Sequence, residues 1–248
     1  MSDPTRDEQR LSFGAVADAY DDIRPSYPVE ALRWVLGDAP LRVVDLGAGT
    51  GLLTRVLVEL GHEVTAVEPD PGMLARLSVR SPSVVAVEGS AEATGLPAAS
   101  VDAVVAGQAY HWFDPGPAHA EIARVLRSGG IFGPVWNFRD ESVGWVARLS
   151  DLVGRKDGGA YKGELGGDAF GAAFGALERA EFASAVTHTA DSLVALMRSR
   201  SYYITATPER QREIETGIRE LVATHQDLRG RETFDLPYVT RAYRAARR

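Results

Sequence analysis

The sequence predicts a doubly wound α/β fold, in which a mostly parallel seven-stranded sheet carries helices on both faces. One observation is the alternation, from residue 41 to residue 136, of short valine-rich segments with segments of helical spacing. This alternation is typical of repeated βαβ units, whose right-handed crossovers place helices on both faces of a parallel sheet. A second observation is size, because 248 residues, 45% of them hydrophobic and 25% charged, suffice for a large buried core.

The expected elements follow one another in a regular order along the chain. Residues 9–21 have helical spacing, and Pro28 can open a second helix that extends to Gly37. The strands are expected at residues 41–46, 64–67, 84–87, 101–106, 131–136, 181–187 and 233–244. The later helices are expected at residues 52–60, 71–77, 118–126, 142–153, 191–200 and 208–225. We expect Gly129 and Gly130 to close the helix at 118–126.

The rhythm of the sequence changes after Asn137, yet no long linker separates the two parts. We therefore expect one domain over residues 1–248, with an N-terminal helical cap at 9–37 and a core at 38–137. Residues 138–248 would add helices, a glycine-rich segment and the final strands. The glycine-rich segment at 154–175 is either a surface loop or a mobile lid.

Charge and composition exclude several classes of function. The net charge of −7 argues against binding to nucleic acid, because an acidic surface repels phosphate. The chain has no cysteine, so disulfides, thiolate metal sites and cysteine nucleophiles are excluded. No apolar run approaches the length of a membrane span, and Met1 to Arg10 lacks the apolar core of a secretory signal, so we expect a cytoplasmic protein.

The strongest chemical feature is the turn after the first strand, where Gly47, Gly49 and Gly51 alternate with other residues. Glycine lets the backbone adopt positive φ and approach a ligand closely. The helix that follows offers unpaired N–H groups at its start. Because ligands of open parallel sheets bind at the carboxyl ends of the strands, this turn is a predicted cofactor site.

The end of the second strand carries a second chemical signal. Glu68 lies 23 residues after Asp45. A carboxylate in this place can accept hydrogen bonds from both hydroxyls of an adenosine ribose. A dinucleotide fingerprint, G-x-G-x-x-G/A, would need a small residue where Leu52 stands, so the G-x-G-x-G spacing weakens a nicotinamide interpretation without abolishing it.

The segment Asp45 to Gly51 resembles motif I of the class I S-adenosylmethionine-dependent methyltransferases. Four further segments match in order, through about residue 137, and together they resemble the type 11 group. These segments are Val67 to Asp70, Gly89 to Glu92, Ser100 to Val105 and Gly129 to Ile131. The resemblance implies a Rossmann-like fold, S-adenosylmethionine as cofactor and S-adenosylhomocysteine as product, with no metal.

The N-terminal segments Phe13 to Tyr20 and Arg24 to Pro28 resemble the cap of trans-aconitate and other small-acid methyltransferases. One residue departs from the family pattern, since Ser90 stands where Asp often contacts the adenine. Glu92 or the backbone near Ala91 could compensate for the weaker contact of a serine.

The resemblance also implies which residues bind the cofactor. They are Tyr20, Arg24, Asp45, Gly47, Ala48, Gly49, Gly51, Glu68, Pro69, Met73, Ser90, Ala91, Glu92, Gln108 and Ala109. Asp45 would either orient the glycine turn or meet the cofactor amine. Arg24 would hold the methionine carboxylate, anchor an acidic substrate or form a surface ion pair. Met73 would pack on the adenine ring.

The substrate side is expected at His111, Trp112 and Trp136. His111 is the candidate general base, because histidine accepts protons near neutral pH. No group of His, Asp or Glu has metal-ligand spacing, and His188 and His225 are expected on the surface.

We therefore predict methyl transfer by in-line displacement to a small-molecule acceptor, such as a carboxylic acid or another oxygen nucleophile. A carboxylate acceptor would need no base at neutral pH. The alternatives are an NAD(P)-dependent oxidoreductase, and a non-catalytic regulatory protein that binds S-adenosylmethionine or S-adenosylhomocysteine. No nucleic-acid or membrane partner is expected, and the sequence does not fix the oligomeric state.

Overall fold

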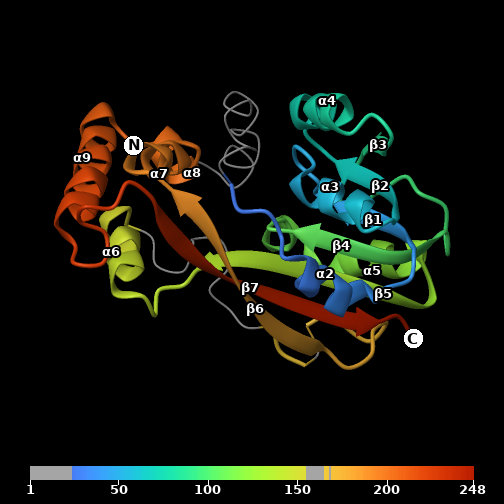
Figure 1. Cartoon of the computed structure of the whole chain (residues 1–248). Coiled ribbons are helices and arrows are strands. Elements are labelled where there is room, and N and C mark those ends of the chain that lie inside the picture. The colour runs from blue at the N-terminus through green and yellow to red at the C-terminus, as the bar shows by residue number, and fades with distance from the viewer. Residues whose placement is uncertain (1–23, 155–164, 168) are drawn as a thin grey trace. The chain divides into compact units, whose positions relative to one another are not determined.

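A computed structural model describes residues 24–154, 165–167 and 169–248 (Figure 1). The helix expected at 9–21 and part of the glycine-rich segment lie outside these residues. The expected α/β fold is confirmed by a seven-stranded sheet with strand order β3-β2-β1-β4-β5-β7-β6. The strands are β1 (Arg42–Leu46), β2 (Glu63–Glu68), β3 (Val85–Glu88), β4 (Val101–Gly107), β5 (Leu126–Arg139), β6 (Glu178–His188) and β7 (Phe234–Ala246).

The first five strands are parallel, as the alternating sequence predicts. Strand β1 pairs with β2 and with β4, β2 pairs with β3, and β4 pairs with β5. Strand order therefore reverses next to β1, which has β2 and β3 on one side and β4 on the other. In an open parallel sheet this reversal opens a crevice at the carboxyl ends of the strands.

The last two strands make the sheet mixed. The N–H of Gly129 donates to the carbonyl of Arg247, and the N–H of Asp140 donates to the carbonyl of Pro237. The residue numbers increase along β5 while those of the partners in β7 decrease, so β7 runs antiparallel to β5. Strand β6 pairs antiparallel with β7 in the same sense, because Glu178 meets Arg244 and Thr187 meets Asp235.

The described helices follow the expected order, with one short addition. They are α2 (Val29–Leu36), α3 (Leu52–Glu59), α4 (Pro71–Arg80), α5 (Pro115–Val125), α6 (Gly144–Leu152), α7 (Ala190–Arg198), α8 (Ser201–Ile204) and α9 (Pro208–Thr224), with a 3-10 helix η2 (Tyr110–Trp112). Helices α2 and α3 share a core with one face of β1, β2 and β4. Helix α4 packs on the same face through Leu77 and Ala66, since Ala66 lies two residues after Val64 in β2. Helix α5 lies on the other face, where its His119 ring packs near that of Phe132 in β5. Both faces are therefore covered, which explains why the strands read as valine-rich runs.

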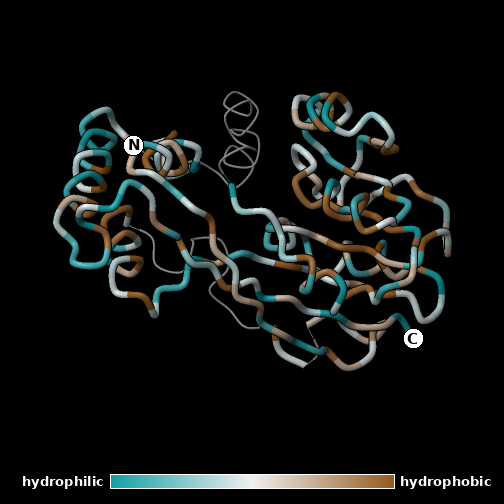
Figure 2. The backbone as a smooth tube through the Cα atoms, in the orientation of Figure 1, coloured by the Kyte–Doolittle hydropathy of each residue, from teal (hydrophilic) through white to brown (hydrophobic). Residues whose placement is uncertain are grey.

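The residues divide into two compact units. Unit 1 comprises residues 1–25, 137–162 and 183–239, and unit 2 comprises residues 26–136, 163–182 and 240–248. The core of unit 1 lies among α6, α7, α9 and the start of β7. Figure 2 shows hydrophobic residues along β1 and β4 of unit 2 and mostly hydrophilic residues along α9 of unit 1. The single-domain organisation stays a prediction.

The structure corrects the junction between α5 and β5. The helix begins at Pro115 and ends at Val125, and β5 starts at once with Leu126 paired to Val101. Gly129 and Gly130 lie inside the strand rather than at the helix end, where the pairing with β4 is irregular. A Cβ at position 130 would lie 2.9 Å from two backbone carbonyl oxygens, so glycine is required by close packing here.

Candidate functional site

The glycine turn joins β1 to α3 at the edge of the sheet where the strand order reverses. Gly47, Gly49 and Gly51 have φ of +71°, +59° and +87°, a region that side chains disfavour. The N–H groups of Gly47 and Ala48 donate to the carbonyl of Val67 at 2.8 and 3.1 Å. The turn is therefore fixed to the end of β2 by backbone hydrogen bonds.

The three glycines face different surroundings. A Cβ at Gly47 would lie 2.7 Å from the Cβ of Ala109, and one at Gly51 would lie 3.1 Å from the Leu77 side chain. Among the described residues, a Cβ at Gly49 would meet only the Met73 sulfur within 4 Å, at 3.8 Å. Gly47 and Gly51 thus permit close packing of the protein, whereas the backbone at Gly49 is open to a ligand.

Glu68 is buried at the end of β2, beside this turn. Its Oε2 accepts a hydrogen bond from the Gly49 N–H at 2.8 Å, and its Oε1 accepts one from the Asp70 N–H at 2.9 Å. These two bonds hold the Glu68 carboxylate against the glycine turn and the start of the segment that follows β2. A carboxylate has about four acceptor sites, and a ribose hydroxyl is a donor of the kind that it accepts.

Asp45 is fully buried beneath the turn. Its Oδ2 accepts a hydrogen bond from the Thr54 hydroxyl at 2.6 Å, and its Oδ1 has no hydrogen-bond partner among the described residues. Burial raises the pKa of Asp45 to about 7, the negative charge of Glu68 adds to this, and the Thr54 hydrogen bond opposes it. The Oδ2 atom of Asp45 therefore fixes the start of α3 through Thr54. Its Oδ1 atom is a buried hydrogen-bond acceptor beneath the glycine turn.

The acidic segment after β2 continues into α4. Asp70 caps this helix by accepting hydrogen bonds from the N–H groups of Gly72 and Met73, with Pro71 at the first helical position. The buried Met73 side chain lies beside Gly49, with its sulfur facing the glycine. Pro69 is half-buried between Glu68 and the cap.

The loop after β3 folds into a tight turn. Ser90 and Ala93 exchange two backbone hydrogen bonds, and the Ser90 hydroxyl accepts a bond from the Glu92 N–H at 3.3 Å. The Glu92 carboxylate accepts a bond from the N–H of Asp114, before α5, at 2.9 Å. Ala91 is buried. Ser90 and Glu92 thus both stabilise this loop, and their predicted contacts with adenine stay predictions.

The segment after β4 carries the strained backbone of the site. Gln108 has φ of +55°, which is uncommon for a residue other than glycine, and its N–H donates to the Val135 carbonyl. Ala109 packs against the glycine turn, as described for Gly47. His111 and Trp112 are half-buried, with ring centroids 4.8 Å apart. Strain of this kind is often associated with functional sites.

Sequence reasoning missed an aromatic cluster behind this segment. The Tyr110 hydroxyl lies 3.0 Å from Nε2 of His119, and the two rings stack. Trp136, a predicted substrate residue, is 1% exposed and makes edge contacts with the rings of Tyr110 and Tyr243. Its side chain therefore supports the core beneath the segment, and the predicted contact with substrate stays a prediction.

Three predictions concern residues outside unit 2. Tyr20 lies outside the described residues. Arg24 belongs to unit 1, where its Nη2 donates to the carbonyl of Ser199 at 2.9 Å. The surface position expected for His188 is wrong, because the residue is 3% exposed and its Nδ1 lies 3.0 Å from the Ser192 hydroxyl. The alternation of β6 buries its last side chain.

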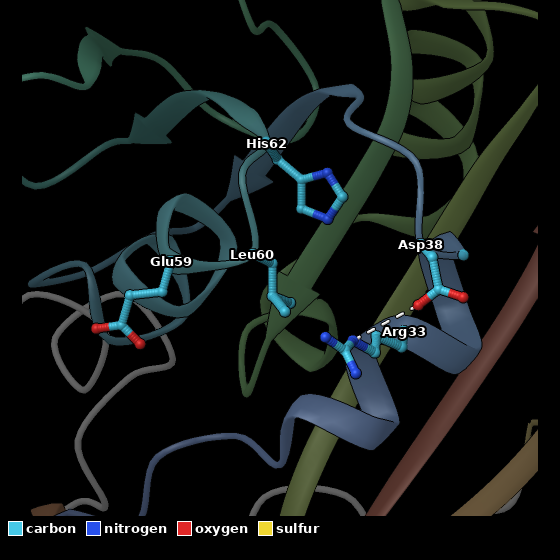
Figure 3. A pocket seen from close by; sticks show the side chains of 6 residues that line it. Arg33, Asp38, Glu59, Leu60 and His62 are labelled. Atoms are coloured by element: carbon cyan, nitrogen blue, oxygen red, sulfur yellow. Dashed lines mark ion pairs between the residues drawn. The ribbon is translucent and has the colours of Figure 1, made fainter.

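A small polar hollow lies at the opposite end of the strands of unit 2 (Figure 3). It is lined by Arg33, Gly37, Asp38, Glu59, Leu60 and His62. Arg33 faces Asp38 at 3.6 Å, and Nδ1 of His62 accepts a hydrogen bond from the Leu41 N–H. Because His62 and Leu41 precede β2 and β1, the hollow is at the amino ends of the strands, away from the edge where ligands bind.

Comparison with known proteins places this geometry in a family. The family model described as a methyltransferase domain, type 11, matches residues 44–133, which run from β1 into β5. An uncharacterized methyltransferase of Mycobacterium tuberculosis is 44% identical over 241 residues, which are 97% of this chain and 98% of the relative. The chain belongs to the class I S-adenosylmethionine-dependent methyltransferases of type 11. Membership identifies S-adenosylmethionine as the methyl donor of the family.

Other methyltransferases agree in fold and in part of the sequence. A structure from Anaeromyxobacter dehalogenans, assigned provisionally as a type II methyltransferase, has a TM-score of 0.62 at 26% identity and covers 90% of this chain and 97% of its own. The malonyl-[acyl-carrier protein] O-methyltransferase of Methylococcus capsulatus is 36% identical over 131 residues, 48% of each protein. None of these matches supports the oxidoreductase alternative.

Two further features of this methyltransferase concern the described part of the chain only. Within those residues, no three His, Asp or Glu side chains are grouped so as to hold a metal ion. Among the described helices, none combines the length and apolar character that a membrane crossing requires.

The raised pKa of Asp45 predicts how stability depends on pH. A carboxyl group whose pKa rises on folding stabilises the folded state fully below its unfolded pKa of 3.8, and this contribution is lost as the pH rises through about 7. Asp45→Asn removes the ionisation but keeps the shape. We expect the stability of the variant relative to wild type to increase by roughly 1–3 kcal/mol between about pH 5 and pH 8.

Urea unfolding at both pH values measures this difference directly. A stability difference between Asp45→Asn and wild type that does not change with pH would show that Asp45 is not a buried carboxyl with a raised pKa.

Proposed function

We propose that this chain binds S-adenosylmethionine at the glycine turn of unit 2 and transfers its methyl group to a small-molecule acceptor. The observation that carries the proposal is the open backbone at Gly49, whose N–H is fixed by the buried carboxylate of Glu68. We propose in addition the roles of the individual residues, an in-line displacement mechanism and the class of acceptor.

The residues at the turn fit the cofactor chemically. Glu68 would accept hydrogen bonds from the ribose hydroxyls, and Oδ1 of Asp45 is a buried acceptor that suits the cofactor amine. Met73 would pack on the adenine ring, since its sulfur borders the open side of Gly49. The other contacts would come from Gly47, Ala48, Gly51, Pro69, Ser90, Ala91, Glu92, Gln108 and Ala109. The cofactor roles of Tyr20 and Arg24 stay predictions from the family resemblance.

When bound, S-adenosylmethionine supplies a methyl group already activated by its sulfonium. The chain therefore contributes proximity, alignment and exclusion of water, which can account for a large part of the rate. Gln108 is held in its strained conformation by the bond to Val135, and we propose that it faces the reacting groups. Where the methylated molecule must lose a proton, His111 would take up that proton as the general base. Trp112 and Trp136 would border the methylated molecule.

We favour an oxygen nucleophile as the acceptor, with a carboxylic acid first among the candidates. The relative from Methylococcus capsulatus is named for O-methylation of a malonyl group, and it is 36% identical to this chain over 131 residues. A carboxylate is ionised at neutral pH, so its attack needs no general base. The cytoplasmic location stays a prediction.

A substitution of Glu68 tests the cofactor site. Glu68→Gln removes the negative charge that would meet the ribose hydroxyls, and it weakens the bonds to Gly49 and Asp70. We expect S-adenosylhomocysteine to bind about 10–100-fold more weakly, measured by calorimetry. Glu63→Gln, on an exposed residue at the start of the same strand, is the matched control and should leave the affinity unchanged.

Equal affinity of wild type and Glu68→Gln for S-adenosylhomocysteine would contradict the proposal. Binding of NADH by wild type, with no binding of S-adenosylhomocysteine, would favour the oxidoreductase. Cofactor binding without transfer to any acceptor would favour the non-catalytic regulatory protein.

A methyl-transfer screen with radiolabelled donor tests the acceptor and the role of His111. We expect transfer to carboxylic acids, with His111→Ala keeping a rate within about threefold of wild type because no proton is removed. For a phenol or amine acceptor the same substitution should lower the rate by about 10²–10⁴-fold. A loss of that size with a carboxylic acid would contradict the base-free mechanism.

A further inference from the structure

Unit 1 contains a group of cationic and phenolic side chains, of which only Arg24 has a predicted role in the proposed methyl transfer. We call it the arginine–tyrosine cluster, and its members are Arg24, Arg139, Arg200, Tyr202 and Tyr238. All five belong to unit 1. They come from four segments far apart in the sequence, so the fold and not local sequence brings them together.

The pairing of β5 with β7 sets the centre of the cluster. The Asp140 N–H donates to the Pro237 carbonyl at 2.9 Å, and the two strands are antiparallel. The preceding residue of β5, Arg139, therefore lies opposite the following residue of β7, Tyr238, on the same face of the sheet. Both side chains are buried.

Two helices complete the surroundings of Arg139. Its Nε donates to the Ser150 hydroxyl of α6 at 3.2 Å, and its Nη1 lies 3.7 Å from the Met197 sulfur of α7. The Tyr202 hydroxyl lies 3.0 Å from the same sulfur. A guanidinium and a phenol thus converge on one thioether, which is a weak acceptor.

The remaining arginines lie around the Tyr238 hydroxyl. Arg24 is bonded to the carbonyl of Ser199, the residue before Arg200. Burial raises the pKa of Tyr238, while the positive charges of Arg200, Arg139 and Arg24 act in the opposite direction. Tyr238 is 2% exposed, and its hydroxyl has no hydrogen-bond partner among the described residues. Buried hydroxyls are normally hydrogen-bonded, so this one indicates a ligand position.

We propose that the arginine–tyrosine cluster binds the carboxylate of a small molecule. A guanidinium presents its N–H groups as a planar fork that matches the two oxygens of a carboxylate. The Tyr238 hydroxyl, and that of Tyr202, can donate to the same group. Arg24, Arg200 and Tyr202 are half-buried, so the cluster is not sealed inside the core. This inference stands apart from the glycine turn and Glu68 of unit 2, and Arg24 is the one residue named in both proposals.

Calorimetry on the full chain saturated with S-adenosylhomocysteine tests the inference. The probes are succinate, citrate and benzoate, with the neutral diamide of succinic acid as the uncharged control and inorganic phosphate as a competing anion. We expect at least one carboxylate to bind in the millimolar range or tighter. Succinamide should not bind.

Two substitutions locate the binding. Tyr238→Phe removes one oxygen atom from a buried ring, and Arg200→Gln changes a half-buried residue, so neither opens a large cavity. Each should weaken carboxylate binding by at least about tenfold and leave the affinity for S-adenosylhomocysteine unchanged. Arg212→Gln is the matched control, because Arg212 of α9 is exposed and pairs with Glu209, and it should have no effect.

Several results would overturn the inference. They are the absence of carboxylate binding by wild type, equal carboxylate binding by wild type and both variants, and tighter binding of phosphate with the same dependence on Tyr238 and Arg200. Because affinity for S-adenosylhomocysteine is measured in the same samples, these failures are distinguishable from a failure of the cofactor site.

Discussion

The hydrogen bonds of the Glu68 carboxylate are the constraint on which the candidate site depends. One oxygen holds the N–H of Gly49 and the other holds the N–H of Asp70, so a single side chain fixes both the glycine turn and the start of α4. Charge-assisted bonds of this kind are stronger than neutral ones. The ends of β1 and β2 therefore present their backbone as one preformed surface, and Met73 is carried to the turn by the helix that Asp70 caps.

A second buried carboxyl group beneath the turn would be costly if both were ionised. Asp45 lies close enough to Glu68 for the two charges to interact, and the result is a raised pKa at Asp45. Near neutral pH, Asp45 is therefore partly protonated. It is hydrogen-bonded to Thr54 at the start of α3. The buried Oδ1 of Asp45 is consistent with a donor supplied by a cofactor.

Much of the core was predictable because its strands are buried on both faces and read as valine-rich runs. Local backbone requirements made three parts of the site predictable, namely the glycine turn, Glu68 and the helix start at Asp70-Pro71. In each of these places the backbone conformation or its hydrogen bonds favour a few residue types. The sequence did not reveal the bulge at Gly129 and Gly130, where a pair of glycines resembles a helix end. Their role depends on the carbonyl oxygens of Arg127 and Asp102, which pack close to position 130.

Long-range pairing accounts for what the sequence could not predict. Strand β7 lies between β5 and β6, an order that no hydrophobic run encodes. That order places Tyr238 opposite Arg139 and buries His188 at the end of β6, although each looks unremarkable in its own segment. The stacked pair of Tyr110 and His119 likewise joins the end of β4 to α5 through space. The roles of polar residues in such places can be inferred only once the fold shows which distant residues lie beside them.

A crystal structure of the wild-type protein with bound S-adenosylhomocysteine would show whether Glu68 holds the ribose of the cofactor. We expect the ribose hydroxyls within hydrogen-bond distance of Glu68 and the ligand in contact with the backbone at Gly49. A ligand bound elsewhere, or a Glu68 carboxylate that contacts only Gly49 and Asp70 while the ribose is held by other residues, would contradict this expectation.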